Sequence, residues 1–153
     1  MATRSVPNLS LEAAVIAANA AQEKAKSMGI DFNIAIVDAS LYLLHFVRMP
    51  NAKLTSIDIS INKAFTAAGH RVPTSTYSTG TKNFLPGGPG YGIHNSNGGR
   101  FMLIGGGIPI QIDGQVVGAI GVSTGTPAQD TEVAQAGVDA INAFVKRRGG
   151  SKL

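Results

Sequence analysis

The segment GIPIQIDGQVVGAIGVS, residues 107–123, decides the fold of this chain. Two runs rich in β-branched residues flank Asp113-Gly114, a dipeptide typical of a two-residue type I′ turn. Such a turn joins antiparallel strands, because its backbone twist matches that of the strands on either side. We therefore predict a β-hairpin here and place the other elements around it.

Helices are predicted at both ends of the chain. Thr126, Pro127 and Gln129 supply an N-cap, a proline at the first helical position and a capping-box partner, for a helix that ends near Arg148. Near the N-terminus, apolar residues recur at helical spacing between Ser10, the expected N-cap, and Gly29, the expected stop.

Three further strands are predicted from runs of β-forming residues. Residues 32–38 and 41–48 read as a hairpin that turns at Ala39-Ser40, and residues 100–105 read as a strand before the 107–123 hairpin. The period of two places apolar residues on both faces of the 41–48 strand. We expect both of its faces to be largely covered.

A central helix is predicted to begin in a capping-box-like pattern at Thr55 and Asp58 and to be closed by Gly69. Its expected core stripe consists of Ile57, Ile61, Ala64, Phe65 and Ala68. Ser56, Ser60, Lys63 and Ala67 line a different face. Lys63 is therefore expected to point away from the core stripe.

The predicted order is helix, two strands, helix, loop, three strands, helix. Helices at the ends and middle of an antiparallel sheet favour an α+β domain. The length of 153 residues suits one domain, which we place at residues 1–148, with a flexible tail at 149–153.

Composition narrows the classes of partner. The net charge is only +4, and the basic residues are scattered outside the C-terminal KRRGGSKL, which disfavours a nucleic-acid partner. The chain has no cysteine for disulfides or thiolate ligands, and no expected metal site. The N-terminus lacks the apolar run of a signal peptide and no segment is long enough to span a bilayer, so we expect a soluble intracellular protein without a membrane partner.

The last three residues, Ser151, Lys152 and Leu153, form the tripeptide that addresses proteins to the peroxisome. RRGG before them is a charged, flexible tether that would let an import receptor reach the tripeptide. We therefore expect a peroxisomal location and an import receptor as one partner.

The stretch GGPGYGIHNSNGG, residues 87–99, is too rich in glycine and asparagine to lie inside a helix or strand. Long loops in compact domains are usually functional or disordered. We predict that residues 85–100 are ordered and fold over the end of the sheet as one wall of a small-molecule pocket. Tyr91, His94 and Asn97 are its candidate ligand-binding residues.

Several motifs resemble one known family in their residues and their order. RMPNAKLTSIDISINKAFTAA, PGGPGYGI, NGG, GGGIPI and GQVVGAIGVSTGTPAQD occur in the order seen in the GlcG/HbpS-like family, also called the haem-degrading domain family, which is similar to the C-terminal part of PduO. The resemblance covers roughly residues 9–146.

This resemblance implies a profilin-like α/β/α sandwich with a five-stranded antiparallel sheet and a homo-oligomeric assembly. Some members bind or degrade haem, so haem is the one cofactor that the resemblance suggests. The chain departs from the family at Arg48-Met49-Pro50-Asn51-Ala52, where the family typically reads Arg-Met-Asp-Gly-Ala. Haem ligation also varies among members, so no histidine is assigned as ligand.

The candidate site residues combine cations, imidazoles and backbone amides. Arg48 and Lys63 suit a carboxylate or a haem propionate, and imidazole suits an axial ligand or an acid–base group. His94 is the favoured histidine, whereas His45 reads as a core residue and His70 as a helix cap. The full set predicted to bind substrate or haem is Arg48, Lys63, His70, Tyr91, His94, Asn97, Gly106, Gly107 and Pro109.

Three functions remain open from the sequence. The first is a protein that binds or degrades haem or a related tetrapyrrole. The second is a cofactor-independent peroxisomal enzyme acting on a small organic acid or carbonyl compound, with Lys63 or His94 moving a proton and Arg48 holding negative charge. The third is a non-catalytic assembly module.

Overall fold

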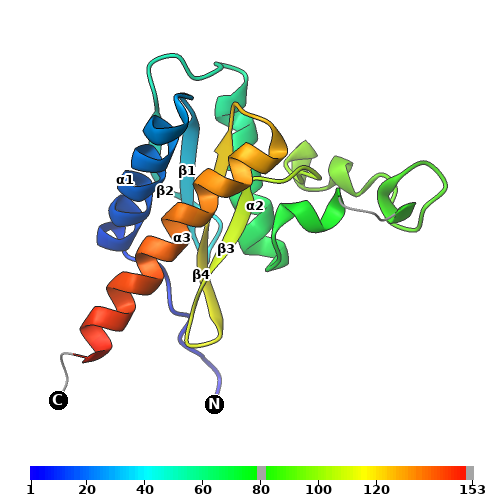
Figure 1. Ribbon diagram of the computed structural model, residues 1–153. Coiled ribbons are helices and arrows are strands. Elements are labelled where there is room, and N and C mark those ends of the chain that lie inside the picture. Colours follow the sequence, from blue (N-terminus) through cyan, green and yellow to red (C-terminus); the bar gives the residue numbers. More distant parts are fainter. Residues whose placement is uncertain (79–81, 151–153) are drawn as a thin grey trace.

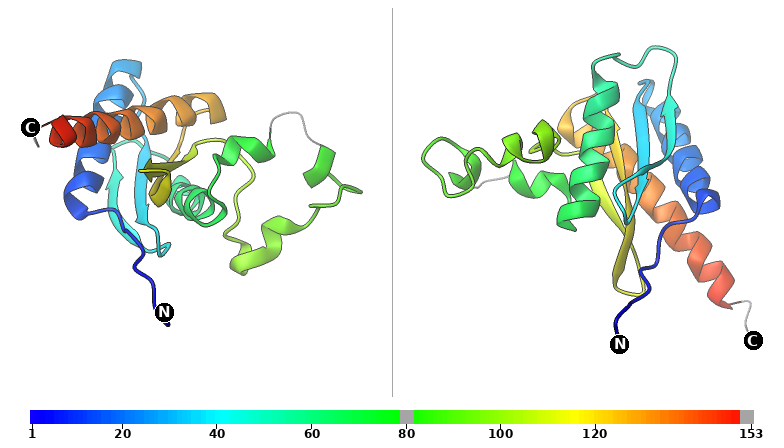
Figure 2. Two further views of the ribbon diagram at one scale, coloured as in Figure 1. Left: turned by 90° about the horizontal axis from the view of Figure 1, so that it is seen from below. Right: turned by 180° about the vertical axis from the view of Figure 1, so that it is seen from behind.

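The fold is a four-stranded antiparallel sheet between two layers of helices, in a computed structural model that describes residues 1–78 and 82–150. The strands run in the spatial order β2-β1-β4-β3, with bounds β1 Asn33–Asp38, β2 Leu43–Arg48, β3 Gly107–Ile112 and β4 Gln115–Ser123. Helices α1 (Leu11–Met28) and α3 (Pro127–Gly150) cover one face, and α2 (Ser56–His70) covers the other (Figures 1 and 2). The predicted α+β architecture is confirmed.

The prediction of a fifth strand at residues 100–105 is wrong. This segment has no strand partner, because the backbone N–H of Met102 donates instead to the Thr66 hydroxyl of α2, at 2.9 Å. The Phe101 ring is buried among other aromatic rings. A run of β-forming residues is therefore held by contacts with side chains, and β3 begins only at Gly107.

The hairpin that anchored the sequence analysis is confirmed. Strands β3 and β4 pair antiparallel with Ile112 opposite Gln115, and the two turn residues have the positive φ that a type I′ turn requires, 51° at Asp113 and 75° at Gly114. Strand β4 also pairs with β1, so it lies at the centre of the sheet.

The capping patterns at the chain ends are confirmed too. The Ser10 hydroxyl accepts from the N–H of Ala13, and Gly29 ends α1 in the left-handed conformation. In α3 the capping box closes in both directions, from the Thr126 N–H to Gln129 and from the Gln129 N–H to Thr126. Helix α3 continues to Gly150, two residues beyond the predicted end. Residues 151–153 lie outside the described residues, so the peroxisomal address stays a prediction.

The predicted start of α2 is confirmed in position, because Thr55 is the N-cap and Asp58 lies in the first turn, but the side-chain cap and the stop at Gly69 are wrong. Thr55 has helical backbone angles and makes no side-chain cap, and the helix runs past Gly69 to His70. Arg71 is the C-cap, with φ 62°, and its N–H donates to the carbonyl of Ala67.

The predicted core stripe of α2 is right for Ala64 and Ala68, which are buried, and for Ile61, which packs against the same cluster, but it leaves out most of the buried face. The buried residues of this helix are Ser56, Ser60, Lys63, Ala64, Thr66, Ala67 and Ala68. Ile57, Ile61 and Phe65 are only half-buried. The sheet packs so closely on α2 that small residues take the contact face, and Ala64 and Ala67 meet Ala35 and Ala119 there.

Strand β2 lies at the edge of the sheet and contains a bulge. Pairing with β1 shifts between Ile36 opposite His45 and Val37 opposite Leu43. The bulge breaks the predicted alternation, so that Leu44 joins Val47 in packing on the α1–α3 side. The expectation that both faces of this strand are covered holds only in part: Leu44 and Val47 pack on one side and Phe46 on the other, but Leu43 is 49% exposed.

Residues 72–78 and 82–100 form an arm that projects from the body beside α2 (Figures 1 and 2). Three 3-10 turns shape it, at Thr74–Tyr77, Lys82–Phe84 and Ile93–Gly99. The glycine-rich stretch therefore does not fold over the end of the sheet as predicted. No helix among residues 1–78 and 82–150 is long and apolar enough to cross a membrane.

Gly121 tests the close approach of α2 to the sheet. A Cβ at this position would collide with the Ser60 carbonyl oxygen and would lie 2.5 Å from the Ala64 nitrogen, both in the α2 backbone. We expect Gly121→Ala to lower the free energy of unfolding by about 1–3 kcal/mol, measured by urea denaturation. Gly149→Ala, in open space, is the control and should change it by less than about 0.5 kcal/mol. Equal effects of the two substitutions would refute the close packing.

Candidate functional site

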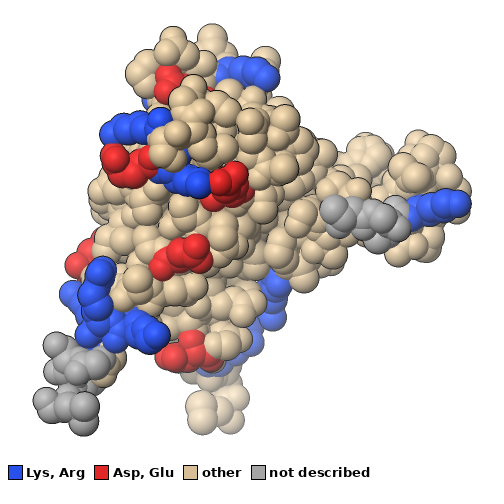
Figure 3. Space-filling model, viewed as in Figure 1, with Lys and Arg blue, Asp and Glu red and all other residues tan. Residues whose placement is uncertain are grey.

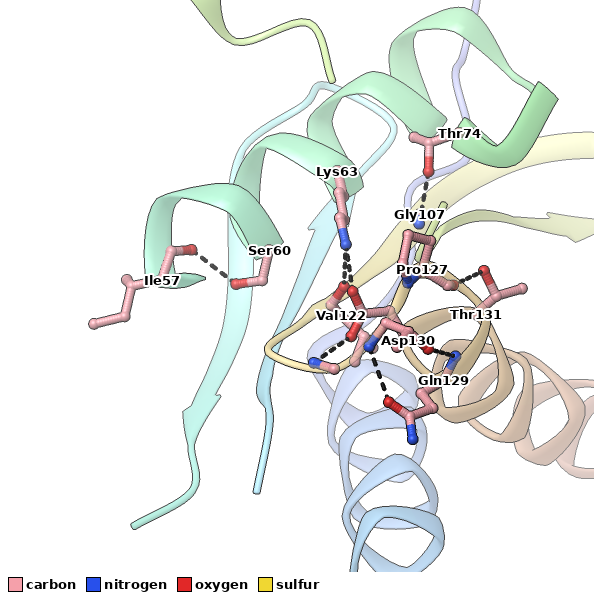
Figure 4. Close-up of polar contacts among 12 residues, drawn as sticks. Ile57, Ser60, Lys63, Thr74, Gly107, Val122, Pro127, Gln129, Asp130 and Thr131 are labelled. Atoms are coloured by element: carbon pink, nitrogen blue, oxygen red, sulfur yellow. Dashed lines mark hydrogen bonds and ion pairs between the residues drawn. The ribbon is translucent and has the colours of Figure 1, made fainter. Parts of the chain in front are cut away.

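The largest fully buried polar side chain of the described residues is that of Lys63, which reaches from α2 past the end of β4 to α3 (Figure 4). Its Nζ atom donates to the Asp130 carboxylate at 2.7 Å and to the Val122 carbonyl oxygen at 3.0 Å. The side chains of Lys63 and Asp130 are 0% and 3% exposed. The pair therefore joins three elements through charge-assisted hydrogen bonds.

Asp130 lies in the first turn of α3, where the helix dipole favours a negative charge. Its second oxygen accepts from the Gly125 N–H at 2.9 Å. Burial raises the pKa of the Asp130 carboxyl, opposed by the charge and hydrogen bond of Lys63. Burial likewise lowers the pKa of the Lys63 ammonium, opposed by Asp130. Each group depends on the other to stay charged in this position.

Two glycines close the space around the pair. At Gly106, a Cβ would lie 2.8 Å from Lys63 Nζ and 2.6 Å from the Val122 carbonyl oxygen. The Gly107 N–H donates to the Thr74 hydroxyl at 2.9 Å (Figure 4). The expectation that Gly107 offers a free amide to a ligand is therefore wrong. Pro109 is buried in β3 opposite Ala119 and lines neither the cleft beside His70 nor the one beside Arg71.

This arrangement changes the reading of the two predicted cations. We predicted that Lys63 points away from the core. The prediction is wrong, because its side chain is enclosed by protein on the buried face of α2. Arg48 is exposed at the end of β2, and no ion pair or hydrogen bond in the described part of the chain joins it to Lys63. The geometry supports a structural role for Lys63, and a catalytic role for it or for Arg48 stays a prediction.

A cleft of about 200 Å³ opens beside the C-terminal end of α2. Its lining residues are Leu41, Phe65, Thr66, Gly69, His70, Asn97 and Phe101. His70 and Asn97, both predicted to bind a ligand, meet here although they lie 27 positions apart in the sequence. The remaining lining is mostly apolar, so the cleft combines one imidazole and one carboxamide with hydrophobic walls.

Aromatic rings hold the His70 imidazole on the cleft wall. The centre of its ring lies 5.1 Å from that of Phe101 and 5.6 Å from that of Tyr77, in edge-to-face packing. The Tyr77 hydroxyl is buried and has no hydrogen-bond partner among the described residues. An unsatisfied buried hydroxyl costs about 1–3 kcal/mol, which makes this corner of the molecule receptive to a further polar partner.

A cation also lies next to the cleft. The Arg100 guanidinium stacks on the Phe65 ring at 3.9 Å, and its Nε donates to the Asn62 side chain. Because Phe65 lines the cleft, this positive charge stands beside an apolar wall. No group of three or more metal-ligating side chains occurs within residues 1–78 and 82–150.

The other predicted histidines lie elsewhere. His94 is exposed on the arm, where its ring centre lies 6.3 Å from that of Tyr91, itself 58% exposed. His45 is half-buried in β2, opposite Ile36. The imidazole of His70, unlike those of His45 and His94, lines the cleft beside the end of α2.

Sequence reasoning missed Asp130, Arg100 and Phe101. Asp130 stands within a capping pattern, which by itself explains an acidic residue in a first helical turn. One signal was available in the sequence. Lys63 stands on a helix face otherwise made of serine and alanine, and if such a face packs on a sheet, its lysine needs a carboxylate opposite. Arg100 and Phe101 were assigned to a strand that does not form.

Comparison with known proteins places these features in a family. The family described as haem degrading protein HbpS-like matches residues 9–139. A 15.0 kDa protein encoded in the dhaT-dhaS intergenic region of Citrobacter freundii is 34% identical over 140 residues, covering 92% of this chain and 96% of that protein.

Solved structures agree with this match. The Klebsiella pneumoniae protein ORFY superposes with a TM-score of 0.89 at 34% identity, covering 94% of this chain and 97% of that one. A PduOC:haem complex superposes with a TM-score of 0.82 at 32% identity, covering 88% of this chain and 96% of that one. A relative of the same fold has thus been crystallised with haem.

The buried pair can be tested by a double-mutant cycle. We expect Lys63→Met and Asp130→Asn each to lower the free energy of unfolding by about 3–5 kcal/mol, because each leaves a buried group without its partner. The double variant should lose clearly less than the sum of the two, measured by urea denaturation. Strictly additive losses would contradict the coupling. The exposed pair of Lys24 and Glu132 is the control, and Glu132→Gln should cost about 1 kcal/mol at most.

Proposed function

The chain belongs to the family of HbpS-like haem-degrading proteins, and from that premise we propose that it binds haem or a related tetrapyrrole in the cleft beside His70. The observation that carries the proposal is the position of His70 between aromatic rings in a mostly apolar cleft. The haem-bound relative supports it, since the fold of that complex is shared along most of this chain.

The residues of the cleft fit the chemistry of haem. Haem supplies an iron that takes imidazole as an axial ligand, and a flat apolar ring that needs hydrophobic walls. His70 offers the imidazole, while Leu41, Phe65 and Phe101 offer the walls. Arg100, which stacks on Phe65, offers a cation for a propionate. Arg48 and Lys63, which we expected in this role, do not line the cleft.

The cleft is small for this ligand. Pockets for small molecules usually measure about 300–1,000 Å³, and this one measures about 200 Å³. One chain would therefore cover only part of a tetrapyrrole. The rest of the ring would stay in solvent or be covered by a second chain, which links ligand binding to assembly.

Haem titration of the purified protein tests the proposal. We expect a saturable shift of the Soret band together with a rise in the melting temperature, because a ligand that binds only the folded state stabilises it. His70→Ala should abolish the Soret shift, because it removes the proposed axial ligand.

Two matched variants complete this experiment. His45→Ala and His94→Ala change the same residue type outside the cleft, and both should titrate as the unsubstituted protein does. Loss of the shift in His94→Ala alone would move the ligand to the arm. A flat titration of the unsubstituted protein would refute haem binding.

We also propose that the chain forms a homo-oligomer through α2 and the arm. Ile57 and Phe65 of α2 are only half-buried, and Leu85 and Tyr91 on the arm are 57% and 58% exposed. In the view of Figure 3, charged side chains are spread over the helical body, while the projecting arm is largely uncharged. Exposed apolar side chains of this kind suit contact between subunits.

A charge placed on this surface tests the assembly. We expect the unsubstituted protein to show the mass of more than one chain in light scattering, and Ile57→Lys to shift it toward the monomer because a buried lysine would lack a partner. Gln135→Lys, on the exposed side of α3, is the control and should leave the mass unchanged. A monomeric unsubstituted protein would contradict the proposal.

A further inference from the structure

A second cleft measures about 520 Å³ and shares no lining residue with the cleft beside His70. It is formed where the N-terminal segment runs beside the β3–β4 hairpin, near the end of α2 (Figures 1 and 2). Its lining residues are Arg4, Ser5, Val6, Pro7, Arg71, Gln111, Gly114, Gln115 and Val116. The volume is in the range of small-molecule sites.

The lining of this cleft contains two arginines and no acidic residue, so the cleft is positively charged. Both of its arginines are exposed, and neither takes part in an ion pair within the described residues. Gln111 and Gln115 add carboxamide donors to the same wall. Guanidinium groups bind carboxylates and phosphates in a bidentate manner, so the cleft has the donors of an anion site.

The backbone at Arg71 is a second, independent sign. Its φ of 62° is the left-handed conformation that glycine favours at the end of a helix. A residue with a Cβ is disfavoured there, by roughly 1–2 kcal/mol. The chain places an arginine on the cleft wall at a position where glycine would be more stable, which points to a role for its side chain.

We propose that this cleft binds a small anion that carries a carboxylate or phosphate group, held between Arg4 and Arg71. Asp113, in the turn next to Gly114, is the acidic residue closest in sequence to the lining and weakens the site by repulsion. The anion site is separate from the proposed haem site. Although His70 and Arg71 are neighbours in sequence, they line different clefts, so anion binding does not require haem.

Isothermal titration of the haem-free full chain with inorganic phosphate and with succinate, at constant ionic strength, tests this site. We expect saturable binding of at least one of them. Phosphate alone would identify phosphate compounds as the ligand class, and succinate alone would identify carboxylates. Absence of binding for both would overturn the proposal.

Substitutions separate binding from folding. Arg71→Gly should weaken binding by roughly tenfold or more, since it removes a charged hydrogen-bond donor, while its melting temperature stays equal or rises because glycine suits the backbone. Arg4→Gln should weaken binding in the same direction. Asp113→Asn should strengthen it and keep the turn, because asparagine also tolerates the left-handed conformation.

Two controls decide whether the site is specific. Arg147→Gln removes an exposed arginine at the far end of α3 and should leave the affinity unchanged. His70→Ala should also bind the anion normally, so that failure of haem binding and failure of this site are distinguished. An equal loss in Arg147→Gln and Arg71→Gly would show binding to net charge only and would overturn the proposal.

Discussion

The buried ion pair between Lys63 and Asp130 is the constraint on which the arrangement of this fold depends. It joins the helix on one side of the sheet to the helix on the other, passing the end of the central strand β4 at the Val122 carbonyl. Neither charge has water to replace its partner, so α2 and α3 must keep their relative positions for the pair to persist. An apolar contact between the two helices would tolerate small sliding movements, whereas a hydrogen-bonded pair at 2.7 Å does not.

The pair also determines which side of α2 faces outward. Because Lys63 must lie against the sheet, Ser60 and Ala64 on the same face are buried with it. Ile57, Ile61 and Phe65 consequently lie at the margin of the helix, where they are half-buried. The hydrophobic side of α2 is thus available to the cleft beside His70 and to the arm. A feature that stabilises the interior thereby creates the apolar surface on which the proposed function relies.

Elements with strong local signals could be predicted from the sequence. The Asp113-Gly114 turn, the capping box of α3 and the caps of α1 involve contacts within a few residues, and all of them are confirmed. Contacts between distant residues decided the errors. The 100–105 segment has the composition of a strand, but the Thr66 hydroxyl takes the N–H of Met102. Likewise, hydrophobic periodicity found only part of the buried face of α2, because it treats lysine as exposed and has no knowledge of the carboxylate 67 positions later.

The candidate site was predicted in part for the same reason. His70 and Asn97 were among the expected ligand-binding residues, yet His70 was read mainly as a helix cap, a role that local sequence explains equally well. The position of His70 in a cleft depends on Tyr77, which belongs to the arm, and on Phe101, which belongs to the irregular segment after the arm. The sequence therefore identifies the histidines that could bind a ligand, but only the packing of aromatic rings shows which of them lies in a cleft. The same reasoning applies to Arg71, whose left-handed backbone is a consequence of where α2 ends and has no counterpart in the sequence pattern.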